Sequence, residues 1–112
     1  MNISYHEIVS DIKTYYDLRA SVDWNNFCVE QTEKALKDRK YFIVARDEEN
    51  AIAMGSVVGD GMYYTIVDVV VRPEYQGCNI GSTIVTNVPG LRKRMRVSLQ
   101  RSVWTKRLQE HP

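Results

Sequence analysis

The segment Gln76–Ser82 has the residue types and spacing to bind an anion. It follows an apolar run and precedes a helical pattern, and the first N–H groups of a helix have no intrahelical partner. The helix dipole adds a partial positive charge at the same end. Gly77 and Gly81 carry no side chain to block a ligand, and Asn79 tolerates a positive φ. On this chemistry alone two interpretations stay open for residues 77–82: a plain strand-to-helix turn, or a binding loop for a phosphate or diphosphate.

Asp68 is the first candidate for proton transfer. It interrupts the apolar run VDVVV, so it either faces a polar cleft, where burial tunes a carboxylate as a base, or is paired. Trp24 follows the first helical segment and is predicted either to line an acceptor pocket or to anchor the core. The other candidates, assigned to turns, loops or packing, are Asp60, Tyr63, Tyr64, Glu74 and Tyr75.

The sequence predicts no metal site. His6 and His111 are isolated, and no Cys or His pair has the spacing of metal ligands. Cys28 and Cys78 lie fifty residues apart and are expected as reduced thiols of a cytoplasmic protein. Cys78 is the less favoured candidate for a covalent acyl carrier.

Two helices are predicted before the sheet. Ser10 is the expected N-cap of a helix over residues 11–22, where apolar side chains recur at three- and four-residue spacings. A second helix covers residues 28–38, with Val29 among the side chains that face the core.

From residue 40 the apolar pattern changes to the short β-branched and aromatic runs of strands. Residues 40–71 are predicted as an antiparallel three-stranded meander, with a hairpin turn at Asp60-Gly61. A helix over residues 80–88 and a strand over residues 95–100 then give a right-handed parallel crossover. With a first strand over residues 2–8 and a last helix over residues 102–111, the predicted order is β-α-α-β-β-β-α-β-α.

The pattern Gln76-x-x-Asn79-x-Gly81, after DVVVRPEY, resembles motif A of the GNAT acyltransferases. The resemblance implies a single acetyltransferase-like domain over residues 1–112, with motif A at 67–82. It implies an α/β (α+β) fold with a mixed, mostly antiparallel sheet and flanking helices.

The resemblance also implies direct transfer of an acetyl group from acetyl-CoA to a small-molecule amine or a protein amine, with no metal. The coenzyme A diphosphate would lie on residues 77–82 and the pantetheine arm along the backbone of Val69–Val71. A strand N–H near Val69 or Val70 would stabilise the oxyanion. The implied cofactor-binding residues are Val69, Val70, Val71, Gln76, Gly77, Cys78, Asn79, Ile80, Gly81 and Ser82.

The sequence departs from the family pattern in three places. Asn79 replaces the usual glycine, Gln109 follows Leu108 where the family has a tyrosine, and the last strands of the sheet are missing. The alternative function is therefore a non-catalytic CoA-binding or dimer-forming remnant, because an uncovered sheet edge favours a homodimer.

The length of 112 residues predicts one domain, and no apolar run is long enough for a membrane span. Residues 1–83 carry a net charge of −5 and the atypical basic segment 84–112 one of +6. Trp104 is the only aromatic residue in that segment, so we do not expect a nucleic-acid partner.

Overall fold

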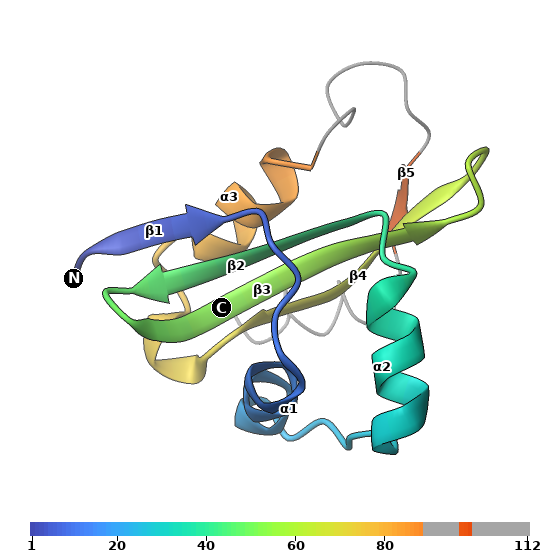
Figure 1. The fold of residues 1–112 in the computed structure, drawn as a ribbon. Helices are drawn as coiled ribbons and strands as arrows, with labels where there is room; N and C mark the ends of the chain where they lie inside the picture. The colour runs from blue at the N-terminus through green and yellow to red at the C-terminus, as the bar shows by residue number, and fades with distance from the viewer. Residues whose placement is uncertain (89–96, 100–112) are drawn as a thin grey trace.

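A computed structural model of the chain describes residues 1–88 and 97–99. They form a mixed sheet with helices on both faces (Figure 1). The helix expected over residues 102–111 and most of the basic segment lie outside the described residues. Within the described ranges, no helix has the length and apolar character needed to span a membrane. The elements are β1 (Ile3–His6), α1 (Ile12–Ser21), α2 (Val29–Lys37), β2 (Tyr41–Asp47), β3 (Asn50–Gly59), β4 (Tyr64–Val71), the 3-10 turn η1 (Pro73–Tyr75), α3 (Ile80–Thr86) and β5 (Val97–Leu99).

The strands lie in the order β1-β2-β3-β4-β5 across the sheet. From β1 to β4 each strand is antiparallel to its neighbour, whereas β5 pairs with β4 in parallel. The chain passes through α3 between β4 and β5, so the predicted parallel crossover is confirmed. The element order of the described residues agrees with the predicted mixed, mostly antiparallel fold.

Both faces of the sheet are covered, α1 and α2 lying on one face and α3 on the other (Figure 1). Leu18, Phe42 and Val70 belong to the core under α1 and α2. Ile43 and Ile84 belong to the core under α3. Because side chains on both faces are buried, the central strands are continuous apolar runs and do not alternate with polar residues.

The first helix begins one residue later than predicted. Asp11, and not Ser10, is the N-cap of α1, and its Oδ1 accepts a hydrogen bond from the Thr14 N–H at 2.7 Å. Ser10 is buried, and its Oγ has no partner among the described residues. Val29, the first residue of α2, does not face the core as predicted: it is 51% exposed and lies within a run of exposed residues, 25–31, at the start of the helix. Leu36 in the last turn of α2 is buried.

Replacing Asp11 with alanine should lower the free energy of unfolding by about 1 kcal/mol, because the Thr14 amide loses its acceptor. The hydrogen bond from that amide lowers the pKa of the Asp11 carboxyl below its ordinary value of 3.8. The stabilisation is therefore present above pH 3.8 and lost as the pH falls through the lowered pKa. Urea unfolding at neutral and at acidic pH measures both effects. Asp11→Asn, which caps without titrating, is the control; a loss of stability that does not depend on pH would contradict the assignment.

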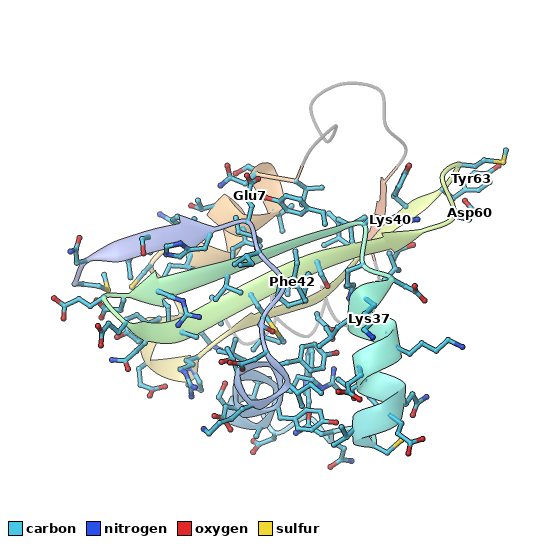
Figure 2. The ribbon with its side chains drawn as sticks, in the orientation of Figure 1. Glu7, Lys37, Lys40, Phe42, Asp60 and Tyr63 are labelled. Carbon is cyan, nitrogen blue, oxygen red and sulfur yellow. The ribbon has the colours of Figure 1, made fainter. Side chains whose placement is uncertain are left out.

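The β3–β4 hairpin turns more widely than Asp60-Gly61 predicts, since β4 begins at Tyr64 and not at Met62. The Asp60 Oδ1 accepts hydrogen bonds from the N–H groups of Met62 and Tyr63, at 2.8 and 3.0 Å. Asp60 and Tyr63 lie at the tip of this hairpin (Figure 2). Tyr63 is 62% exposed there, so it takes part in neither core.

Candidate functional site

β4 contains a β-bulge at Asp68. Between the pairs Val70–Met54 and Val67–Ser56, β4 has two residues where β3 has one. Asp68 has a φ of +54°, in the left-handed region that few non-glycine residues adopt. A bulge redirects side chains, and here Val67 and Asp68, adjacent in sequence, both line one pocket instead of pointing to opposite faces.

The bulge lies beyond the residues of β4 that pair with β5. β5 pairs only with Tyr64–Ile66 of β4. In the described part of the chain, no strand lies beside the outer edge of residues 67–70. Val69, Val70 and Val71 are 3%, 0% and 3% exposed, because their side chains fill the cores on the two faces. This stretch therefore offers backbone groups, and not side chains, to an extended ligand.

The loop after β4 has the left-handed residues that its sequence predicts. Gly77 has a φ of +87° and Asn79 one of +64°. The first hydrogen bond of α3 runs from the Thr83 N–H to the Asn79 carbonyl, at 3.1 Å. The N–H groups of residues 79–82 thus have no intrahelical partner, and those of residues 77–78 have no backbone partner among the described residues. We call residues 77–82 the amide loop.

Two side chains fix the start of the amide loop. The Gln76 Nε2 donates to the Val71 carbonyl at 3.1 Å, at the end of β4. The Tyr75 hydroxyl donates to the Asp47 Oδ2 at 2.6 Å, at the end of β2. The same hydrogen bond raises the pKa of Tyr75 above its ordinary value of 10.0. These contacts connect the approach to the amide loop with two strands of the sheet.

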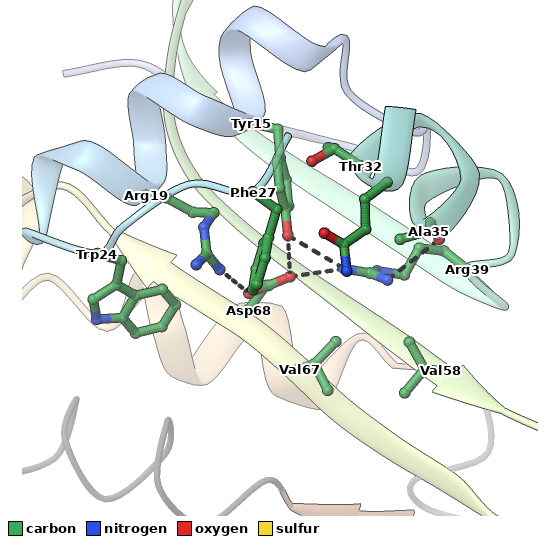
Figure 3. Close-up of a pocket in the computed structure, with 11 residues that line it drawn as sticks. Tyr15, Arg19, Trp24, Phe27, Thr32, Ala35, Arg39, Val58, Val67 and Asp68 are labelled. Carbon is green, nitrogen blue, oxygen red and sulfur yellow. Dashed lines mark hydrogen bonds and ion pairs between the residues drawn. The ribbon is translucent and has the colours of Figure 1, made fainter. Parts of the chain in front are cut away.

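A pocket of about 470 Å³ opens beside the bulge, between α1, α2, β3 and β4 (Figure 3). Trp24 lines this pocket and also packs against the core under α1 and α2, so its position fits both predicted roles. Phe27 is 55% exposed beside it. The pocket's aromatic and charged lining residues are Tyr15, Arg19, Trp24, Phe27, Arg39 and Asp68.

The Asp68 carboxylate is held by three donors at one wall of the pocket (Figure 3). Its Oδ1 accepts from the Arg19 Nη1 at 2.8 Å, and its Oδ2 from the Arg39 Nη2 at 2.8 Å and the Tyr15 hydroxyl at 2.7 Å. The side chains of Asp68, Arg19 and Arg39 are 10%, 11% and 9% exposed. Of the two predicted environments, a polar cleft and a paired carboxylate, Asp68 has both.

Tyr15 stays a hydrogen-bond donor in this cluster at neutral pH. Burial, with a further contribution from the Asp68 charge and hydrogen bond, raises the pKa of Tyr15 to about 12. Its proton is therefore directed at the carboxylate. Arg19 is packed by aromatic rings, with its guanidinium carbon 5.7, 5.3 and 5.2 Å from the ring centres of Tyr15, Trp24 and Phe27.

Sequence reasoning missed Arg39 and the pairing role of Arg19. Arg19 had a usable signal, because it lies among the core-facing positions of its helix and a buried arginine requires a partner. Arg39 follows α2 and has no such signal.

Tyr64 packs against buried apolar residues. Among residues 1–88 and 97–99, no three His, Cys, Asp or Glu side chains converge as metal ligands.

Several solved acetyltransferases share this fold. A probable acetyltransferase from methicillin-resistant Staphylococcus aureus is 27% identical, with a TM-score of 0.77 over 87% of this chain and 77% of that one. A GNAT-family acetyltransferase from Streptococcus pneumoniae is 25% identical, with a TM-score of 0.76 over 96% and 85%. PaiA N-acetyltransferase from Thermoplasma acidophilum, solved with coenzyme A, shares the fold alone, at 17% identity and a TM-score of 0.56 over 77% and 69%.

The sequence assigns the chain to one family within that class. A family model described as an acetyltransferase (GNAT) domain matches residues 38–111. The chain therefore belongs to the GNAT acetyltransferase family. No curated protein matches it.

Proposed function

We propose that the chain is an N-acetyltransferase that moves the acetyl group of acetyl-CoA to an amine by direct attack. One observation carries the proposal: among the described residues no strand lies beside residues 67–70 of β4, and the amide loop follows this strand after the short turn η1. An extended ligand with a diphosphate at one end matches this arrangement. The solved relative with coenzyme A is similar to this chain in fold and supports this choice of ligand.

The amide loop would hold the diphosphate of acetyl-CoA. The N–H groups of residues 77–82 supply donors, the N-terminus of α3 adds a partial positive charge, and residues 76–82 contain no acidic side chain. The pantetheine arm would then lie along residues 69–71 and pair with their backbone as an added strand. A backbone N–H of Val69 or Val70 would face the thioester oxygen as its negative charge develops.

The pocket beside the bulge would receive the acceptor. It adjoins Val67 and Asp68 and therefore lies next to the proposed thioester position. An amine that enters from this side forms the N–C bond as the C–S bond breaks. The ammonium proton passes to a base, and the departing thiolate takes up a proton. Asp68 stays the predicted base and Trp24 a predicted acceptor contact; small-molecule and protein amines both remain candidates for the acceptor.

We also propose that the protein is cytoplasmic, and the state of its two cysteines supports this location. Cys28 and Cys78 are free and exposed. Exposed free thiols suit a reducing compartment, where disulfides are rare.

Isothermal titration with acetyl-CoA tests the proposal, and Ser82→Glu is the informative variant. Ser82 is an exposed residue in the first turn of α3. A glutamate there complements the helix dipole, so the melting temperature should not fall, but its charge repels the diphosphate. We expect the Kd of acetyl-CoA to rise by at least about tenfold.

Thr86→Glu is the matched control, since it adds the same charge at the other end of the same helix. It should leave the Kd of acetyl-CoA nearly unchanged. If the unmodified protein does not bind acetyl-CoA at millimolar concentration, the proposal fails. If it binds but releases no thiol with a panel of amines, the non-catalytic alternative is the correct one.

A further inference from the structure

Arg39 contacts the bulge of β4 at Asp68 and reaches the residue before the bulge, Val67, through Ser56. Its Nη2 donates to the Asp68 Oδ2 at 2.8 Å. Its Nε donates to the Ser56 Oγ at 3.0 Å, and that hydroxyl donates to the Val67 carbonyl at 3.3 Å. Its Nη1 reaches back to the Ala35 carbonyl in α2, at 3.3 Å. The guanidinium therefore links α2 to the carboxylate of the bulge and, through one hydroxyl, to the carbonyl of the residue before the bulge.

The bulge requires such support. A left-handed conformation at a non-glycine residue persists only where the surrounding structure holds it, and Asp68 has a φ of +54°. Arg19 binds Asp68 and the segment after α1. Arg39 binds Asp68 and also Ser56 on the neighbouring strand β3. The Arg39 side chain is 9% exposed, and a planar guanidinium holds two acceptors in a fixed geometry that an ammonium does not reproduce.

We propose that Arg39 is a positioning residue for the acetyl-CoA edge of β4. It holds the bulge at Asp68 and so aims the backbone of Val69 and Val70 at the pantetheine arm and the thioester. Its contacts are with Ala35, Tyr15, Ser56 and Asp68, all outside the amide loop and the proposed pantetheine edge. The inference rests on the proposed function.

The test compares two ligands on the variant Arg39→Met. Acetyl-CoA would use both the edge of β4 and the amide loop, whereas ADP, a nucleoside diphosphate without a pantetheine arm, would use the amide loop alone. Arg39→Met should raise the Kd of acetyl-CoA by about tenfold and change the Kd of ADP by about twofold or less. A purely structural role would weaken both ligands together, because both need the folded chain.

Arg39→Met leaves Arg19 and Asp68 as a paired cation and anion, so each buried charge that remains keeps one oppositely charged partner. If this variant does not fold, Arg39→Lys keeps the charge but not the fork and should show a smaller change of the same kind. Arg46→Met is the matched control. The Arg46 Nη1 donates to the Glu49 carbonyl, away from the bulge, and its loss should leave both affinities unchanged.

Hydrogen exchange of the Val69 and Val70 amides gives a readout that does not need a ligand. It should become faster in Arg39→Met than in Arg46→Met. Equal changes for acetyl-CoA and ADP, or no change in either affinity or in exchange, would overturn the inference. Failure of the unmodified protein to bind acetyl-CoA would instead count against the proposed function.

Discussion

Replacing Asp68 with asparagine should lower the free energy of unfolding by about 3 to 5 kcal/mol. The substitution leaves two buried guanidinium groups, those of Arg19 and Arg39, without their counter-charge. Asparagine has nearly the same size and also adopts a positive φ readily, so packing and backbone strain change little. The loss is therefore a loss of charge pairing. Urea unfolding monitored by circular dichroism measures it.

Asp17→Asn is the control for this experiment. Asp17 forms an exposed pair with Lys13 at 2.8 Å in the same helix as Arg19, and exposed pairs contribute little to stability. The urea midpoint of Asp17→Asn should stay close to that of the unmodified protein. If Asp68→Asn instead keeps the midpoint of the unmodified protein and abolishes acetyl transfer, Asp68 acts as the base and its pairing is not a major source of stability.

Gly55→Ala should cost about 1 to 3 kcal/mol and also weaken acetyl-CoA binding. A methyl group at Gly55 would lie 2.5 Å from the Ile84 Cγ2, so α3 would have to move away from β3. The amide loop begins α3, and a displaced helix carries its N–H groups with it. Thermal unfolding and titration with acetyl-CoA measure the two effects on one variant.

A double-mutant cycle with Ile84→Ala isolates the cause. Ile84→Ala alone should cost about 2 to 5 kcal/mol, because it removes a fully buried side chain. In the double variant the space that Ile84 leaves accepts the new methyl group. The double variant should then be more stable than the sum of the single effects predicts, by at least about 0.5 kcal/mol. Strict additivity would show that α3 does not limit the space at Gly55.

Features that depend on neighbours along the chain could be predicted from the sequence. Gly77 and Asn79 adopt the left-handed conformations that their types allow, and they do so at the expected helix start. The apolar runs became central strands, since a strand buried on both faces needs no polar alternation. The parallel crossover followed from the strand-helix-strand order.

Features that depend on register between distant strands could not be predicted. The bulge at Asp68 exists because β4 has one residue more than β3 over that stretch. The register in which the two strands pair cannot be predicted from the sequence of either strand alone. The position of Arg39 just after α2 follows from the local sequence. Its contacts, however, are with Ser56 and Asp68, which lie 17 and 29 residues away in the chain. At a finer scale, Ser10 and Asp11 are both good caps, and only the observed contact with Thr14 separates them.

The bulge requires β4 to keep one residue more than β3, whatever the residue types are. Deleting Asp68 or Val69 would restore regular pairing with β3 and return Val67 and the residue after it to opposite faces. Homologues can therefore exchange the valines of this strand for other apolar residues, but a single-codon deletion would remove the bulge. Alignment gaps should avoid these two positions even where sequence identity is low.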